Sequence, residues 1–268
     1  MFNAFYGLSF NPFTKHADPK QACFRSNDFH EMTTRLDHIK NVRGIGLFTA
    51  QPGFGKTYAL RCFADNLNPN LHQMAYICLT TVSVTEFYRQ FCTVLNLDIS
   101  AQRAAMFKAI QERLYLMFKE KRRPFILAID EAHEMDSRAL KDIKMIMNHA
   151  YDSLNCFTLL LIGEPHLNNI LSKPIHEALL QRITIHYNFA GLSPEETISY
   201  TNHKISAAGA SPTILAEAAA RAVHGFSQGN PRLVDNVMSD ALTIGAQLNK
   251  KIIDTDVILA AVENQSFQ

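Results

Sequence analysis

The sequence carries almost no net charge. Its 26 lysine and arginine residues are balanced by 25 aspartate and glutamate residues, which leaves a formal net charge of +1. A strongly basic chain is therefore excluded. Any contact with nucleic acid must come from a local patch of cations, or from patches summed over several copies of the chain.

Paired cysteines are also lacking. The five cysteines are scattered, and no two of them form a Cys-x-x-Cys pair. Most lie among apolar residues, so we interpret them as reduced thiols of a protein in a reducing cytosol. They are Cys23, Cys62, Cys78, Cys92 and Cys156.

Long hydrophobic runs are absent. The opening MFNAFYGLSFNPF has no basic region followed by a long apolar core, unlike a signal peptide. The longest apolar runs, such as FTLLLIG, are too short to span a membrane. The sequence also has no internal repeat or low-complexity linker. We expect a cytoplasmic protein with no membrane contact.

What is present is an alternation of short apolar runs with longer amphipathic stretches. Hydrophobic residues make up 47% of the 268 positions, enough for a substantial core. Continuous apolar runs are typical of central parallel strands, and their alternation with helices predicts an α/β doubly wound sheet. The expected strands are 44–50, 73–80, 124–130, 156–163 and 183–189. The expected helices between them are 56–67, 84–95, 104–123 and 137–153.

The pattern changes to helices alone after residue 192. Ser193 and Pro194, followed by two glutamates, form a typical helix start. We predict an α/β domain over 1–192, a hinge near Gly191 and a helical domain over 193–268. The expected helices of the second domain lie within 193–209, 213–229, 230–248 and 254–265.

The stretch AQPGFGKT, after the first strand, has the spacing of a phosphate-binding P-loop. Backbone N–H groups of such a loop face the phosphates, a lysine reaches the β- and γ-phosphates, and a hydroxyl binds Mg²⁺. Ala50 stands where the usual pattern has glycine, a small change if its φ is negative. The expected nucleotide-binding residues here are Gln51, Pro52, Gly53, Phe54, Gly55, Lys56, Thr57 and Tyr58.

The stretch FILAIDEAH supplies a second acidic element. Asp130, at the end of an apolar strand, is expected to hold Mg²⁺ together with Thr57, and Glu131 to activate the attacking water. Two acids after a strand can also cap a helix, but the upstream P-loop makes that the lesser interpretation. Asp-Glu-Ala-His also occurs in helicases. The chain offers no second helicase lobe, so we interpret His133 as incidental.

Three further residues are candidates by position. Glu164, at the tip of the fourth strand, would lie near the γ-phosphate; alternatively it is an exposed loop acid. Arg182, before the last strand, could reach the nucleotide of a neighbouring subunit, or form a surface ion pair. Arg232, in Gly-Asn-Pro-Arg at a helix start, could fold over the γ-phosphate, the interpretation that we favour.

Together these elements resemble the AAA+ ATPases over nearly the whole chain. The resemblance implies a P-loop domain with a five-stranded parallel sheet, a C-terminal helical lid, and ATP with Mg²⁺ as ligands. It implies that Glu164 is sensor 1, Arg182 the arginine finger and Gly229–Arg232 the sensor 2 segment. Ala50 and Glu164 depart from the usual residues of the family. These departures concern details of the site and not nucleotide binding.

The opening FYGLSFNPF and the strings around the P-loop resemble the ExeA-like branch more particularly. That branch includes a secretion ATPase and transposon-encoded regulators of the MuB, TniB, TnsC and IstB type. The latter resemblance implies a ring or helical filament on duplex DNA that recruits a DDE-type transposase. It also implies that residues 1–40 contribute to the nucleotide pocket. The aromatic residues of that segment can equally be core or subunit contacts; they are Phe5, Tyr6, Phe10 and Phe13.

DNA contacts by this interpretation would come from the helices after the second strand. The resemblance places this region against DNA, whereas charged helix faces are more commonly only solvated. The run KEKRR at 119–123 is better explained as a helix C-terminus. The candidate DNA-binding residues are Arg89, Arg103, Lys108 and Arg113.

The sequence leaves three functions open. The first is an ATP-dependent, largely non-sequence-specific DNA-binding ATPase that regulates transposition. The second is an ExeA-type secretion or assembly ATPase that acts on protein partners at a membrane. The third is a nucleotide-locked binding module with negligible turnover, which Glu131 and Arg182 argue against. We expect hydrolysis that is slow until oligomerisation or DNA stimulates it.

Overall fold

We analysed a computed structural model that describes residues 2–14, 24–78, 83–121, 124–149 and 154–265. Cys23, the last two residues of the expected strand 73–80, the end of the basic run 119–123 and the end of the expected helix 137–153 lie outside these residues. The chain forms two compact units. One comprises residues 31–52 and 56–189, and the other comprises residues 1–30, 53–55 and 190–268.

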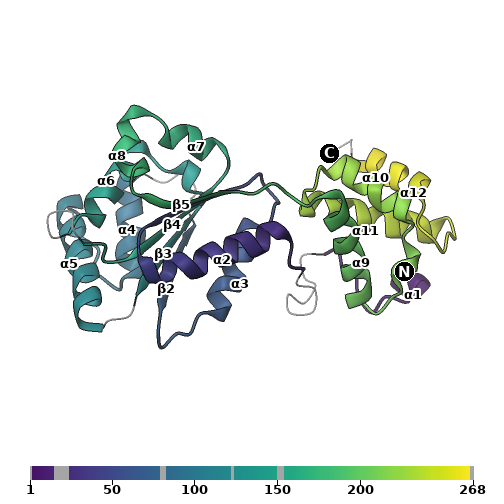
Figure 1. The fold of residues 1–268 in the computed structure, drawn as a ribbon, viewed down its shortest axis with the longest axis horizontal. Helices are drawn as coiled ribbons and strands as arrows, with labels where there is room; N and C mark the ends of the chain where they lie inside the picture. Colours follow the sequence, from purple (N-terminus) through teal and green to yellow (C-terminus); the bar gives the residue numbers. More distant parts are fainter. Residues whose placement is uncertain (1, 15–23, 79–82, 122–123, 150–153, 266–268) are drawn as a thin grey trace. The chain divides into compact units, whose positions relative to one another are not determined.

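The first unit is built around a five-stranded sheet in the order β2-β3-β4-β1-β5, with every neighbouring pair parallel (Figure 1). All five predicted strands are confirmed within a few residues of their expected ends. They are β1 (Ile45–Thr49), β2 (Gln73–Cys78), β3 (Phe125–Asp130), β4 (Thr158–Gly163) and β5 (Ile183–Asn188).

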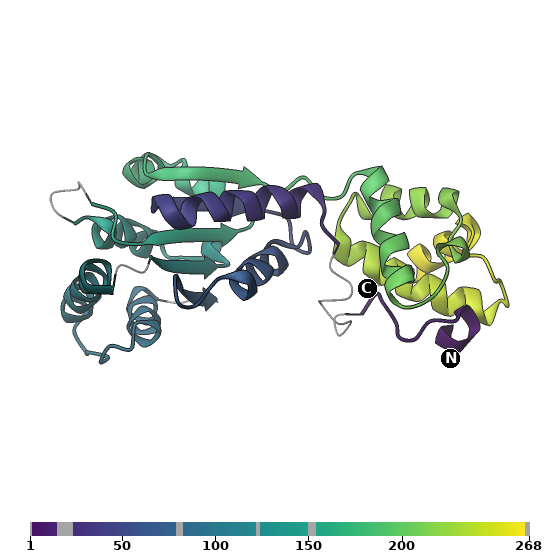
Figure 2. The ribbon, with the colours of Figure 1, turned by 60° about the horizontal axis from the view of Figure 1, so that its bottom comes forward.

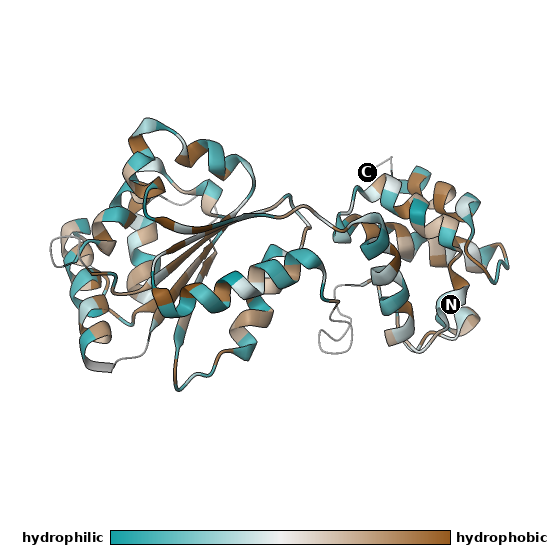
Figure 3. Ribbon diagram, in the orientation of Figure 1, coloured by the Kyte–Doolittle hydropathy of each residue, from teal (hydrophilic) through white to brown (hydrophobic). Residues whose placement is uncertain are grey.

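Burial follows the position of each strand in the sheet. Every residue of β1, β3 and β4 is buried, whereas the edge strand β5 alternates between half-buried and exposed residues. The continuous apolar runs in the sequence thus mark the three central strands. Figure 3 shows the apolar character of these strands inside the unit.

Helices cover both faces of this sheet (Figures 1 and 2). One face carries α2 (Asn27–Val42) and α3 (Lys56–Asn66). The other carries α4 (Val84–Val94), α5 (Arg103–Lys121) and α6 (Ser137–Met147). Short helices α7 (His166–Leu171) and α8 (Glu177–Leu180) lie between β4 and β5.

Helix α2 has no counterpart among the expected helices. Its Met32, Leu36 and Ile39 are buried and recur at the spacing of one helix face. Ile39 packs where a side chain at Gly46 of β1 would stand, and its carbonyl accepts a hydrogen bond of 3.3 Å from the Thr158 hydroxyl of β4. The apolar spacing that predicts this helix is therefore present in the sequence upstream of the P-loop.

The second unit is helical. It contains α9 (Pro194–Ala207), α10 (Glu217–Ser227), α11 (Pro231–Gln247) and α12 (Thr255–Gln265), as the sequence predicted. Ser193 and Glu196 form a reciprocal capping box at the start of α9, with Pro194 at the first helical position. These local signals explain why this helix begins where the sequence indicates.

The N-terminal segment packs with these helices. The short helix α1 (Phe2–Tyr6) lies against α11, and the Tyr6 hydroxyl donates a 2.8 Å hydrogen bond to the Lys250 carbonyl. Tyr6 and Phe13 are buried in the core of the helical unit. Residues 1–30 therefore group with the C-terminal helices, whereas the sequence prediction assigned residues 1–40 to the ATPase domain.

Within the described residues, no helix combines the length and the apolar character needed to cross a membrane.

Candidate nucleotide-binding and catalytic site

The P-loop lies between the end of β1 and the start of α3. Gly53 and Gly55 both have a φ of 90°, a conformation that favours glycine. Ala50 is buried, keeps a negative φ and donates a 3.1 Å backbone hydrogen bond to Gly163 of β4. Alanine therefore fits this position without strain. Helix α3 begins directly after this turn, at Lys56, and the N-terminus of a helix favours bound anions.

Lys56, the first residue of α3, is 6% exposed. Among the described residues, none forms a hydrogen bond or an ion pair with its ammonium group. A largely buried cation with no anionic partner keeps only part of its hydration. An anion bound in the loop would compensate this charge, and the phosphates of a nucleotide fit the requirement.

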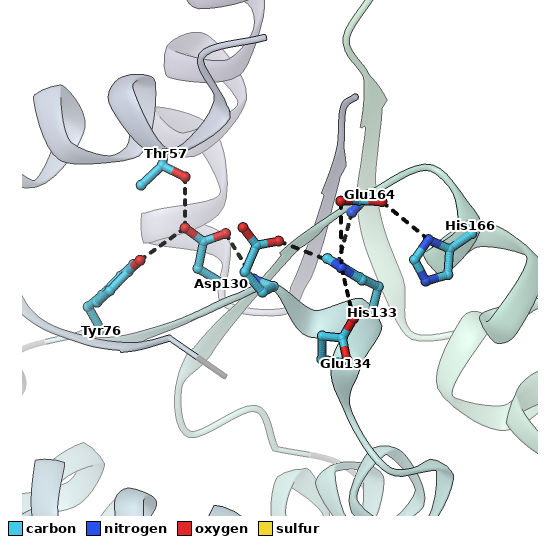
Figure 4. A network of polar contacts seen from close by, with 8 residues as sticks. Thr57, Tyr76, Asp130, His133, Glu134, Glu164 and His166 are labelled. Carbon is cyan, nitrogen blue, oxygen red and sulfur yellow. Dashed lines mark hydrogen bonds and ion pairs between the residues drawn. The ribbon is translucent and has the colours of Figure 1, made fainter. Parts of the chain in front are cut away.

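Thr57 and Asp130 meet at the place where a magnesium ion is expected. The Thr57 hydroxyl donates a 2.8 Å hydrogen bond to Asp130 Oδ2, which joins α3 to the end of β3 (Figure 4). Adjacent oxygens around octahedral Mg²⁺ are about 3.0 Å apart when each lies about 2.1 Å from the ion. The hydroxyl and the carboxylate are therefore spaced like two ligands of such an ion.

Asp130 is buried and has two further hydrogen-bond donors. The Tyr76 hydroxyl of β2 donates to Oδ2 at 3.0 Å, and the Glu131 backbone N–H donates to Oδ1 at 2.9 Å. Burial, and next the Asp130 charge, raise the pKa of Tyr76, so that the phenol stays a donor. Sequence reasoning missed Tyr76. Its only signal is its place on the strand beside β3, since the register pairs Cys78 with Asp130.

Glu131 follows β3 in a left-handed backbone conformation, with a φ of 54°. Its carboxylate Oε2 lies 3.5 Å from Nδ1 of His133, in the 3₁₀ turn Ala132–Glu134. The backbone N–H of Glu164 donates to the same nitrogen at 3.2 Å. His133, which the sequence interpretation set aside, thus joins the two predicted acidic residues.

The close approach of His133 to β4 depends on Gly163. A side-chain carbon at this glycine would stand 3.2 Å from His133 Nδ1 and 3.3 Å from its backbone nitrogen. The His133 side chain is only 6% exposed. The imidazole is therefore held firmly between the ends of β3 and β4.

The sequence analysis also missed a second polar cluster, which lies at the carboxyl ends of β1 and β5. Asn168 of α7 donates to the Thr49 hydroxyl at 3.2 Å and to Asn188 Oδ1 at 3.0 Å. His186 Nε2 lies 3.2 Å from Asn168 Oδ1. Thr49 and Asn188 end β1 and β5, so the cluster ties the start of the P-loop to the last strand. No motif marks these residues.

Arg182 and Asp130 lie at opposite ends of the parallel strands, since Arg182 precedes β5 and Asp130 ends β3. Arg182 directly precedes β5, whose first residue pairs with Ile45 at the start of β1. The six residues of β5 cover about 20 Å. Arg182 is therefore far from the P-loop of its own chain, as an arginine that serves a neighbouring copy has to be.

Arg232 lies in the first turn of α11. The side chain of Asn230 caps this helix and accepts a 3.0 Å hydrogen bond from the Arg232 backbone N–H. Gly53 of the P-loop belongs to the same compact unit. A side-chain carbon there would stand 2.5 Å from Asn230 Oδ1 and 2.8 Å from Arg232 Cβ. The glycine thus permits this contact, which the sequence did not predict.

The candidate DNA-binding cations lie on α4 and α5, and three of them face acids. Arg89 lies 3.5 Å from Glu86, Arg103 lies 3.7 Å from Asp142, and Lys108 lies 3.8 Å from Glu112. The fourth, Arg113, is half-buried. The net positive charge of this surface is therefore smaller than its arginines and lysines alone indicate.

The parallel five-stranded sheet, the P-loop and the acids after β3 define a P-loop fold of the AAA type. Comparison with known families agrees, because residues 39–171 match the family model described as "AAA domain".

Two characterised proteins are similar to the chain in sequence. General secretion pathway protein A of Aeromonas hydrophila is 29% identical over 267 residues, which cover 98% of this chain and 48% of that protein. Replication factor C small subunit of Staphylothermus marinus is 26% identical over 226 residues, 81% of this chain and 58% of that protein. The chain thus spans roughly half the length of each of these curated relatives.

Solved structures with this fold include Cdc6p of Pyrobaculum aerophilum, with a TM-score of 0.67 and 14% identity over 94% of this chain and 70% of that one. The Thermotoga maritima RuvB Holliday junction branch migration motor has a TM-score of 0.61 and 16% identity over 91% and 72%. Aeropyrum pernix ORC1, in complex with DNA, has a TM-score of 0.62 and 12% identity over 90% and 65%. At these identities the likeness shows the fold alone.

Proposed function

We propose that the chain binds ATP with Mg²⁺ at Ala50–Thr57 and hydrolyses it. The observation that carries this proposal is the buried, unpartnered Lys56 beside the Thr57–Asp130 contact of 2.8 Å. The P-loop N–H groups and Lys56 bind the phosphates, while Thr57 and Asp130 hold the metal ion. Bound Mg²⁺ would supply neutralising charge to the β- and γ-phosphates.

Glu131 is the general base of the proposed reaction. Its carboxylate accepts the proton of the attacking water, and His133 orients that carboxylate. Glu164 lies on the other side of the same imidazole, with Oε1 3.8 Å from Nε2, and we assign it the sensor 1 position. Arg232 in the helical lid is assigned to sensor 2.

Completion of the site requires a second copy of the chain. Because Arg182 lies at the far end of the strands in its own sheet, it is placed to enter the site of a neighbouring copy and stabilise charge on the γ-phosphate. Isolated copies should therefore hydrolyse ATP slowly, and assembly should accelerate the reaction.

We further propose that ATP drives this assembly on duplex DNA and that the assembled form recruits or stimulates a DDE-type transposase. Support comes from the resemblance of the N-terminal and P-loop strings to transposition ATPases. The ion pairs on α4 and α5 imply weak contacts per copy. Useful affinity then arises from many copies along the DNA backbone, with little sequence preference.

The test is binding of a labelled random-sequence duplex, measured by fluorescence anisotropy at several salt concentrations. The nucleotide states are none, ADP, ATP and a non-hydrolysable ATP analogue. We expect cooperative, salt-sensitive binding with ATP or the analogue, and none with Lys56→Ala. Lys251→Ala, at an exposed lysine of the helical unit, serves as a control that keeps both the P-loop and the candidate DNA-binding residues. Absence of binding in every state, with ATPase activity intact, would contradict the DNA proposal.

A second candidate is an ATPase that acts on protein partners in secretion. The similarity to general secretion pathway protein A over 98% of this chain favours it. For this candidate function we expect the same ATP chemistry but no affinity for duplex DNA. The anisotropy measurement therefore separates the two candidates while leaving the proposed ATPase site untouched.

A further inference from the structure

The aromatic residue at the tip of the P-loop packs within the helical unit. Phe54 is half-buried although it lies between two glycines, and residues 53–55 group with residues 190–268 in one compact unit. We propose that Phe54 is a positioning residue, whose ring fixes the P-loop against the hinge segment 190–192 and thereby prepares the loop for the phosphates. This inference rests on the proposed function, because it concerns the same ATP site.

The edge of the Phe54 ring lies on the backbone of Gly191. A side-chain carbon at Gly191 would stand 3.0 Å from Cε2 and 3.3 Å from Cζ of this ring, closer than the separation that packed carbon atoms prefer. Gly191 also has a φ of 87°, which favours glycine. The glycine therefore leaves the space that the ring occupies.

The hinge segment is itself held from two sides. The buried Asp28 carboxylate, at the start of α2, accepts the Gly191 N–H at 2.8 Å and the Ala190 N–H at 3.2 Å. The Leu192 N–H donates a 2.8 Å hydrogen bond to the carbonyl of Gly229, in the turn before α11. The ring of Phe54 thus rests on backbone that other contacts already fix.

The two glycines beside Phe54 give this anchor its effect. Gly53 and Gly55 allow the loop to bend around phosphate, but glycine loses more conformational entropy than any other residue when it becomes ordered. A ring that is packed between them restricts the loop before the nucleotide binds, so less entropy is lost on binding. The contact of Gly53 with Asn230 holds the neighbouring residue in the same unit.

Two other roles for the ring have different signatures. A ring that contacted the nucleotide directly would not depend on the residue at position 191. A ring that only stabilised the fold would change the amount of active protein, and hence the maximal rate, but not the affinity for ATP. A positioning role predicts weaker binding with a nearly unchanged maximal rate, because Asp130 and Glu131 are not altered.

The experiment measures binding of a fluorescent ATP analogue, and ATP hydrolysis, by the full chain with Mg²⁺. We expect Phe54→Ala to bind about tenfold more weakly, the effect of ordering about one further residue on binding, with a maximal rate within about threefold of the wild type. Phe54→Leu, which keeps a branched apolar side chain, should recover most of the affinity. Phe226→Ala, at an exposed phenylalanine of α10, should bind as the wild type does.

Gly191→Ala tests whether the ring acts through the hinge segment. The new side chain displaces the ring, so affinity should again fall about tenfold. In the double variant with Phe54→Ala the ring is absent, and affinity should equal that of Phe54→Ala instead of falling about a hundredfold. Gly209→Ala is the matched control, because Gly209 has the same φ of 87° in the same unit, but a side-chain carbon there would meet Ser9 Oγ and not the P-loop.

Wild-type affinity in either single variant, additive losses in the double variant, or a lower maximal rate without weaker binding would each overturn the proposal. Circular dichroism shows which variants are folded. If Gly191→Ala is not, Asp28→Asn takes its place in the same cycle, because it removes one of the two acceptors of the hinge N–H groups. A wild type that does not bind the analogue contradicts the proposed function as well, whereas a wild type that binds it no more tightly than Phe54→Ala refutes this inference alone.

Discussion

The Thr57 hydroxyl donates a 2.8 Å hydrogen bond to Asp130, across 73 positions of sequence. This contact joins the helix that follows the P-loop to the strand that carries the acids. It brings the two motifs of the predicted nucleotide site to one edge of the sheet.

Replacement of Lys56 by alanine should abolish the charge that faces the phosphates. We expect ATP affinity to fall about tenfold to a hundredfold, since a hydrogen bond to a charged group contributes about 1.5–3 kcal/mol. Thermal stability should not fall, because no described residue forms a hydrogen bond or an ion pair with the Lys56 ammonium group. Fluorescent-nucleotide titration and a thermal melt measure both effects, and Lys108→Ala is the control.

Glu131→Gln should separate binding from hydrolysis. The amide keeps the size of the side chain but cannot act as a base, so turnover should drop on the order of a hundredfold to ten-thousandfold. ATP binding should persist, because Glu131 is not a phosphate ligand. Equal turnover in the variant and the wild type, in single-turnover phosphate release, would remove Glu131 from the mechanism.

Arg182→Ala should lower the hydrolysis rate of the assembled protein about a thousandfold while leaving ATP binding by single copies unchanged. Arg221→Ala, on the exposed face of α10, is the matched control. Mixing Arg182→Ala with Lys56→Ala should restore activity, because one variant supplies the P-loop and the other the arginine. No recovery on mixing would speak against action on a neighbouring copy.

Tyr76→Phe removes one donor to Asp130 without changing the packing of the ring. We expect the Mg²⁺ concentration for half-maximal hydrolysis to rise about tenfold, as is usual when a partner of a metal ligand is lost. The maximal rate at saturating Mg²⁺ should change little. Tyr115→Phe, on the exposed face of α5, should leave the Mg²⁺ dependence as it is in the wild type.

Asp136 should contribute to stability in a defined pH range. It caps α6, and hydrogen bonds from the side chain and then the backbone of Arg138 lower its pKa from 3.8 to about 2. A lowered folded-state pKa means that the contribution is complete above pH 3.8 and is lost as the pH falls toward 2.

Asp136→Ala should therefore cost about 1 kcal/mol at neutral pH, the usual value of such a cap. The difference from the wild type should shrink as the pH falls through 2 and vanish below it. Denaturant unfolding at several pH values measures this, with Asp98→Ala, in the loop after α4, as the control. A difference that persists unchanged at low pH would contradict the assignment.

The strands and the P-loop could be predicted because their signals are local. Central strands such as β3 and β4 are buried on both faces and read as continuous apolar runs. The turn after Ala50 needs glycine at positions with positive φ. Each of these sequence signals lies within a few consecutive residues.

The surroundings of the acids could not be predicted in this way. Tyr76 and His133 reach Asp130 and Glu131 through strand register and through the space that Gly163 leaves. Asn168 meets Thr49 and Asn188 only because α7 returns over the end of the sheet. Such contacts join segments far apart in the chain, and no short pattern encodes them.

Because β5 runs parallel to β1, the two ends of the sheet carry different functional residues. Arg182 precedes β5, while the P-loop and Asp130 lie at the opposite ends of the parallel strands β1 and β3. In the proposed assembly, the surface that supplies the arginine therefore differs from the surface that receives it. A contact between such surfaces is head-to-tail and not two-fold symmetric. An open array of copies would have an unfilled nucleotide site at one end and an unused arginine at the other. The two ends would then differ in hydrolysis rate, and loss of copies would begin at only one of them.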